Sequence, residues 1–167
     1  MPAPRLEPDE ALAGPLYAVA AILVAMPAVD FLMSVGSPQL ASVQWRFATV
    51  GLLSGFTLTP ILGVALALGV AGIRQHAMVQ RVLTVLSLLT AVALFVLLLG
   101  FILDMLQLRR QVPAEGLPAF KSASLRAALK HAMSASAFAY LWWNGRRMVP
   151  ERSRSKPQRP PVTIVTK

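Results

Sequence analysis

The chain has 167 residues and a net charge of +9; 56% of its residues are hydrophobic and only 14% are charged. A soluble domain is about 45–50% apolar and about 25% charged, and a soluble chain this short could not bury so much apolar surface. The sequence has no cysteine, which excludes disulfides, thiolate metal sites and thiol catalysis. These values indicate a small integral membrane protein.

The N-terminal part predicts a retained membrane anchor. Residues 1–14 are polar and include three acidic side chains, whereas a secretory signal begins with a basic segment. The first apolar run, Leu16–Val35, covers about 30 Å at 1.5 Å per residue, which is the thickness of the hydrocarbon core. We therefore expect this run to be the first membrane span.

The middle of the chain predicts two further spans. The second apolar segment runs from Arg46 to about Ile73 and contains Pro60, which predicts a kink because proline removes a helical hydrogen bond. A short basic hairpin loop, Arg74–Arg81, follows. The third segment, Val82–Leu106, is the clearest span, since it carries no charged residue before Asp104.

The segment Ser122–Asn144 is ambiguous. On a helical wheel, large apolar side chains such as Leu125 and Leu129 share one face, and Arg126 and Lys130 share another with Ser134. The segment closes with an aromatic run before two arginines, which is typical of a membrane boundary with a cytoplasmic stop.

Two all-α architectures follow from this pattern. The first is a bundle of four transmembrane helices, which explains the short basic hairpin and the aromatic exit. The second has three spans and a basic amphipathic helix that lies on the membrane surface, and the distribution of Lys and Arg favours it. We take the four-span bundle as the prediction, with a polar segment at 1–14, a transmembrane domain at 15–145 and a basic, proline-rich tail at 146–167.

The tail is expected to remain without a core and to be cytoplasmic. It carries basic side chains that would bind anionic lipid headgroups or an acidic partner surface, without specific recognition of nucleic acid. Arginine-rich and alanine-rich composition is typical of a bacterial chain, so the predicted location is the bacterial inner membrane. The predicted tail contacts are Arg146, Arg147, Arg152, Arg154, Lys156 and Arg159.

Two sets of residues are candidate interaction sites. Gly51, Ser54 and Gly55 form a GxxxG-type pattern, whose small side chains let another helix approach closely. Asp30 lies within the first span, where an ionised group needs a partner. In a four-span bundle it approaches the same side as three other charged residues, and the predicted ion network is Asp30, Arg46, Asp104 and Lys130.

The sequence contains no pattern for catalysis, a cofactor or a metal cluster. His76 and His131 are the two histidines, and we expect both to be interfacial polar residues on opposite sides of the membrane. The leading hypothesis is a non-catalytic accessory or scaffold subunit of a larger membrane complex that contacts other membrane subunits. The alternative is a small oligomeric, proton-linked transporter or channel that uses Asp30.

Overall fold

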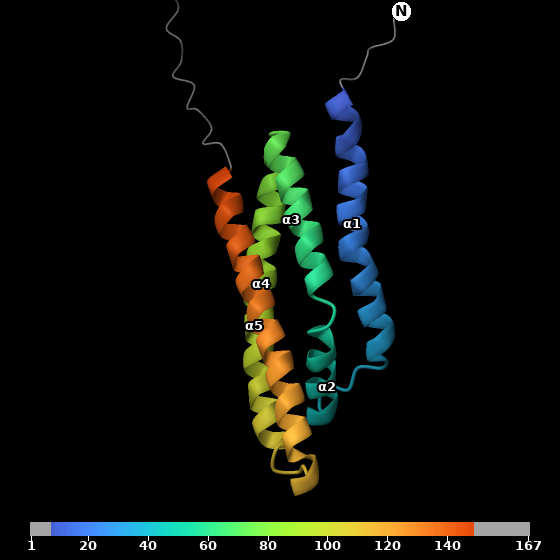
Figure 1. Ribbon diagram of the computed structural model, residues 1–167, viewed down its shortest axis with the longest axis vertical. Coiled ribbons are helices and arrows are strands. Elements are labelled where there is room, and N and C mark those ends of the chain that lie inside the picture. Colours follow the sequence, from blue (N-terminus) through green and yellow to red (C-terminus); the bar gives the residue numbers. More distant parts are fainter. Residues whose placement is uncertain (1–7, 149–167) are drawn as a thin grey trace, which may run out of the picture.

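The computed structural model describes residues 8–148, with side-chain surroundings from Leu12 onward. This part of the chain is helical and contains no strand (Figure 1). The elements are α1 (Pro8–Val35), α2 (Val43–Leu53), α3 (Leu58–Ile73), α4 (Ala77–Leu108), the short 3-10 helix η1 (Ala114–Gly116) and α5 (Leu117–Met148). The all-α prediction is confirmed.

The helices form an elongated bundle whose successive passes run in opposite directions. The chain descends in α1, returns through α2 and α3, descends in α4 and returns in α5, so both ends of the described part lie at the same end of the bundle (Figure 1). The pair α4 and α5 packs most extensively, α1 packs mainly on α3, and α2 packs on α4. The described parts of α1 and α5 do not contact each other.

Two helices are long and apolar enough to cross a membrane: α4, and α1 over Leu12–Val35. A third span results if the bent pair α2 and α3 is counted as one. Basic residues and serines lower the hydropathy of α5, which does not join this group. The described chain therefore has two or three candidate spans, and the prediction of four is not confirmed.

The predicted kink in the second segment is confirmed as a break between α2 and α3, whose axes differ in direction by 48°. Pro60 is the third residue of α3, so its missing N–H falls in the first turn, where helical N–H groups have no partner within the helix. The break therefore lies just before Pro60, between Leu53 and Leu58.

The predicted element boundaries need three corrections. Helix α1 starts at Pro8, inside the segment predicted to be a polar N-terminus. The hairpin after α3 is only Arg74–His76, because Gln75 adopts a positive φ of 57° that turns the chain within three residues. Helix α5 starts at Leu117, well before the predicted Ser122, because its first turn follows η1 directly.

The α4–α5 pair has a regular seam. The buried residues of α4 recur at spacings of three, four or seven, which is the period of helices that pack side by side. The inward face of α5 consists mostly of small side chains, while most of its large apolar side chains, with the exception of Phe138, point outward. The buried residues of α5 are Ser124, His131, Ser134, Ala135, Phe138 and Gly145.

Candidate functional site

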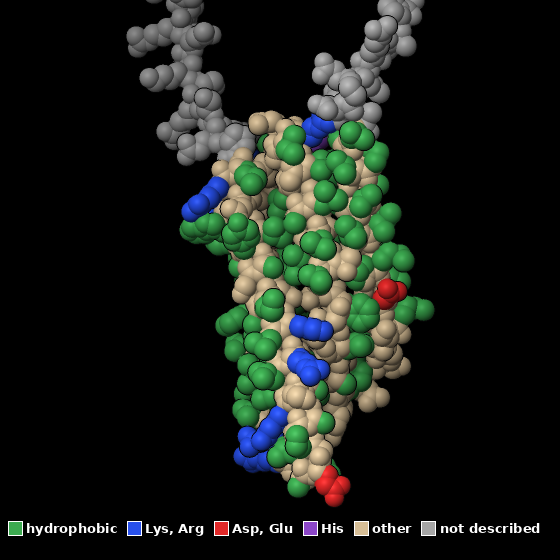
Figure 2. Space-filling model, in the orientation of Figure 1, with side chains coloured by type: hydrophobic (Ala, Val, Ile, Leu, Met, Phe, Trp, Pro, Cys, Tyr) green, Lys and Arg blue, Asp and Glu red, His purple; other side chains and the backbone are tan. Residues whose placement is uncertain are grey.

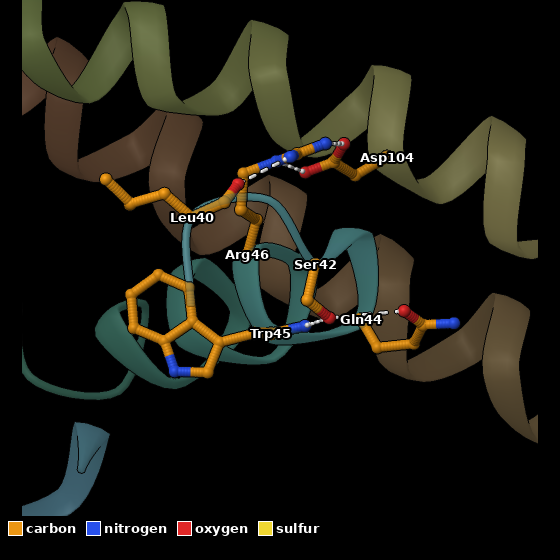
Figure 3. A network of polar contacts seen from close by, with 6 residues as sticks. All are labelled: Leu40, Ser42, Gln44, Trp45, Arg46 and Asp104. Atoms are coloured by element: carbon orange, nitrogen blue, oxygen red, sulfur yellow. Dashed lines mark hydrogen bonds and ion pairs between the residues drawn. The ribbon is translucent and has the colours of Figure 1, made fainter. Parts of the chain in front are cut away.

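The principal polar contact of the bundle joins α2 to α4 (Figure 3). Arg46 donates two hydrogen bonds to the Asp104 carboxylate, from Nε to Oδ2 at 3.1 Å and from Nη2 to Oδ1 at 2.8 Å. Its Nη1 donates to the carbonyl of Leu40 at 2.8 Å. Asp104 is buried, whereas the Arg46 side chain is 37% exposed. This two-point geometry fixes orientation as well as charge, so the pair holds the short α2 against α4.

Local sequence explains why Arg46 reaches Asp104. Ser42 caps α2, with its hydroxyl oxygen accepting a hydrogen bond from the backbone N–H of Trp45 at 3.3 Å (Figure 3). The cap starts the helix two residues before Trp45 and places Arg46 in its first turn. Gln44 extends from the same turn, and its Nε2 donates to Oε1 of Gln111 at 3.4 Å, which adds a link to the turn that follows α4.

The predicted ion network is therefore reduced to one pair. Arg46 and Asp104 come together, but neither Asp30 nor Lys130 forms an ion pair with another described residue. Asp30 does not pair with Arg46, because α1 leans on α3 while Arg46 points toward α4. Asp30 is exposed on the outer side of α1, and only its backbone carbonyl accepts a side-chain hydrogen bond, from Ser34 at 2.7 Å.

Asp30 lies deeper along the bundle than its distance from the end of α1 suggests. Helix α1 ends at Val35 and stops short of the far ends of α4 and α5 (Figure 1). The adjacent Phe31 contacts Phe56 in the α2–α3 break, with ring centroids 6.1 Å apart. Phe31 also lines a cavity together with Leu97, which lies inside the uncharged stretch of α4. The carboxylate is thus beside apolar structure rather than at its end.

Lys130 is exposed on α5, one turn from the exposed Arg126. Figure 2 shows basic side chains partway along one face of the bundle and an acidic side chain on its edge, away from the bundle ends. The next residue along from Lys130, His131, stacks on Phe101 of α4, whose position is again within the uncharged stretch. Charged side chains on two separate helices therefore lie partway along the bundle, away from its ends.

The predicted packing pattern does not form one helix face. Helix α2 ends at Leu53, so Ser54 and Gly55 belong to the break, and of the three residues only Gly51 lies in a helix. A Cβ on Gly51 would lie 3.7 Å from Phe101, an ordinary contact distance. The prediction is corrected because Ser54 turns its hydroxyl to the carbonyl of Gly51 at 2.6 Å, as the helix ends.

Two other glycines carry the close helix approaches. A Cβ on Gly63 of α3 would lie 2.8 Å from the carbonyl oxygen of Ala20 and 3.0 Å from Cβ of Leu23, both on α1. A Cβ on Gly145 of α5 would collide with the hydroxyl of Thr84 and lie 3.3 Å from the Thr84 Cβ. Sequence reasoning missed Gly145 because no second glycine in α5 marks a small-residue motif around it.

His131 is fully buried, which corrects its prediction as an interfacial residue. Its ring lies at the end of an aromatic row in which Phe120 stacks on Phe47, Phe47 on Phe101 and Phe101 on His131. Nδ1 lies 3.1 Å from the carbonyl of Ala127, and Nε2 has no hydrogen-bond partner. His76 lies in the turn between α3 and α4, where its Nδ1 is 3.1 Å from the hydroxyl of Tyr17.

Two cavities of about 590 Å³ each open along the side of the bundle, the first against the second half of α1 and the second between α2 and α4. They share Phe31 and Leu53 in their linings. The first is lined almost entirely by apolar side chains, and the second ends at the Arg46–Asp104 pair. Asp30 lines neither cavity.

The start of the predicted tail is part of α5. Arg146 and Arg147 lie in its last turn, where the Arg146 guanidinium is 4.0 Å from the ring centroid of Trp143 and 4.8 Å from that of Trp142. Such pairs of arginine and tryptophan are typical of membrane boundaries. The remaining predicted tail contacts, Arg152, Arg154, Lys156 and Arg159, lie outside the described residues.

Within residues 8–148 no cluster of three or more His, Asp or Glu side chains could hold a metal ion. Comparison of the chain with protein-family models, with curated proteins and with solved structures found no match. The class that the fold defines is a helical membrane protein, and its role has to be argued from the bundle itself.

Proposed function

We propose that this chain is a non-catalytic accessory or scaffold subunit of a larger membrane complex, and that it crosses the membrane four times. The packing of α5 supports the fourth crossing. Helix α5 lies lengthwise against α4, buries small residues such as Ser134 and Gly145, and turns Leu125, Leu129 and Met133 outward. Small residues inside and large apolar residues outside are the pattern of helices surrounded by lipid.

Asp30 carries the functional proposal. Its carboxylate lies on the outer face of α1, beside apolar structure, and has no cationic partner among the described residues. An ionised group near the centre of a membrane costs about 2.5–3.5 kcal/mol on insertion scales, and such groups are usually paired. A cationic group on a neighbouring protein chain would offset this cost. This arrangement fits a subunit whose Asp30 gains a cationic partner only when the subunit assembles with another protein chain.

Transport is the second candidate, and the geometry favours it less. A proton-linked transporter needs its carboxylate in a water-accessible chamber, whereas Asp30 lines neither of the two large cavities. Those cavities are bordered mainly by apolar side chains, which suit lipid chains rather than a hydrophilic substrate. Asp30 could then serve transport only at a contact between chains.

The basic end of the chain supports attachment to a charged surface. Arg146 and Arg147 against Trp142 and Trp143 would place this end of α5 at a membrane boundary, with the basic tail beyond it. Each basic residue near an anionic lipid surface contributes about 1 kcal/mol. The proposed location is the bacterial inner membrane, with the tail in the cytoplasm, where it contacts anionic headgroups or a partner subunit.

Gentle extraction of the protein from its own membranes, followed by native electrophoresis and mass spectrometry, tests the proposal. We expect stoichiometric co-migration with a larger assembly, and we expect Asp30→Asn to weaken it. Val29→Ala, which alters the neighbouring exposed position without touching the charge, is the matched control. Migration as a lone monomer or a homo-oligomer would overturn the subunit proposal and make flux in liposomes, with and without Asp30, the next measurement.

A further inference from the structure

The outer face of α1 is an apolar stripe interrupted by one acid. Its exposed residues recur at spacings of three and four, as expected for one side of a helix. Asp30 follows Met26 by one turn on the same side. The stripe consists of Val19, Ile22, Met26, Val29 and Met33.

The outer face of α5 has the opposite character. Leu125, Leu129 and Met133 are exposed at four-residue spacing, and Arg126 and Lys130 flank them. No described acidic residue forms an ion pair with either cation. The bundle thus presents an acid within an apolar face on one helix and two cations beside an apolar face on another.

A chain of contacts places the acid and the cations at similar depth. Phe31, next to Asp30, contacts Phe56 in the α2–α3 break. The hydroxyl of Thr57, the next residue, lies 2.7 Å from that of Ser134 on α5. Ser134 is one turn beyond Lys130 and donates to its carbonyl at 2.8 Å. Asp30 and Lys130 are therefore connected through the α2–α3 break, and both lie partway along the bundle at similar depth.

These charges do not meet within one chain, since Asp30 forms no ion pair with Arg126 or Lys130 in the described residues. The described parts of α1 and α5 do not contact each other, since α1 rests on α3 and α5 rests on α4. Two copies inserted in the same orientation hold their matching groups at the same depths automatically. A foreign partner would need a cation placed at the same depth by coincidence or selection.

We propose that a second copy of this chain docks its α5 against α1, so that the Asp30 carboxylate of one protomer accepts hydrogen bonds from Lys130, assisted by Arg126, of the other. This inference rests on the proposed role as an assembling subunit and names one of its partners. The surrounding apolar side chains of α1 and α5 supply the packing. The charge pair sets the register between the two helices and requires both protomers to be inserted in the same orientation.

Cysteine cross-linking in native membranes tests the contact, because the chain contains no cysteine of its own. Val29→Cys on one tagged copy and Leu129→Cys on a second tagged copy place thiols beside Asp30 and Lys130 and leave both charges intact. We expect a disulfide between the two tagged copies. The matched control is Val29→Cys with Phe95→Cys, since Phe95 is equally exposed but lies on α4.

Charge substitution then separates pairing from chance proximity. Asp30→Asn in the Val29→Cys copy should lower the cross-linked fraction about tenfold, which corresponds to about 1.4 kcal/mol. Asp30→Lys should abolish cross-linking, and Arg126→Glu with Lys130→Glu in the other copy should restore it. A cross-link no stronger than the Phe95 control, or one unaffected by these charges, would overturn the inference.

The two proposals fail in different ways. Native co-migration with other proteins, without the cross-link between copies, overturns self-association and keeps the accessory-subunit role. The charge-dependent cross-link without any larger assembly supports self-association and overturns the accessory-subunit role. A monomer that gives neither result overturns both.

Discussion

Helices α4 and α5 and helices α1 and α3 are two antiparallel pairs in one bundle, but they are held very differently. Helix α5 buries residues along most of its length against α4, whereas Ala20 is the only buried residue among the described side chains of α1. Both pairs depend on a glycine at the point of closest approach, Gly145 in the first and Gly63 in the second.

The difference shows that length and apolar composition do not decide how firmly a membrane helix is held. Helix α1 passes the hydropathy criterion and has a single buried residue among its described side chains, while α5 fails the criterion and is packed along α4. In a membrane, helices associate through close packing of small residues and polar contacts, since lipid solvates large apolar side chains as well as protein does. The predictions below test this contrast.

The largest expected effect is at the α4–α5 seam. Gly145→Val should destabilise the bundle by about 3 kcal/mol, because the new Cβ collides with Thr84, whose own Cβ is fixed by the α4 backbone. Unfolding of the purified protein by titration with SDS measures the loss. Gly69→Val is the control, since a Cβ on Gly69 would meet nothing within 4 Å; equal losses in both variants would refute the seam's importance.

A smaller and local effect is expected at the α1–α3 contact. Gly63→Val should cost about 1–3 kcal/mol and should release α1 from the bundle, because its Cβ meets the Ala20 carbonyl, a backbone atom that moves only with the helix. An Ala20→Cys background provides a single thiol at the interface, and its reaction rate with a thiol reagent in detergent should rise. An unchanged rate would show that α1 is held by more than this contact.

The ion pair between α2 and α4 predicts an ordering of stabilities. Arg46→Gln should destabilise more than the double variant Arg46→Gln with Asp104→Asn, because loss of the arginine alone leaves a buried carboxylate uncompensated. SDS unfolding midpoints of the two single variants and the double variant test this. The opposite order would mean that Asp104 is stabilised chiefly by something other than Arg46.

The smallest expected effect is at the hydrogen bond between Thr57 and Ser134. Ser134→Ala should cost about 0.6 kcal/mol, the mean for such bonds between membrane helices. Ser122→Ala is the control, because the Ser122 hydroxyl is exposed and bonds only to the nearby carbonyl of Ala119. If Ser134→Ala lowered the stability more than the Arg46 and Asp104 variants do, the hydrogen bond between Thr57 and Ser134 would be the more important polar contact of the bundle.

Several features could be predicted from the sequence because they depend on local chemistry. The uncharged stretch Val82–Leu103 requires a lipid-facing or buried helix, since its backbone must satisfy its own hydrogen bonds. Pro60 interrupts the second segment because it lacks an N–H. The excess of apolar over charged residues predicts helices that are long and apolar enough to cross a membrane, and α1 and α4 meet that criterion.

Only the tertiary structure decided which groups meet. Asp30 and Asp104 are both carboxylates near the ends of apolar segments of the sequence. Because α1 packs on α3 and α2 packs on α4, Arg46 pairs with Asp104 and Asp30 stays exposed on the outside of the bundle. The inward face of α5 is the one that carries serine, alanine and glycine, because small side chains let two helices approach closely. His131 is buried on the same face. Such choices depend on the shapes of neighbouring helices, which no single segment of the sequence contains.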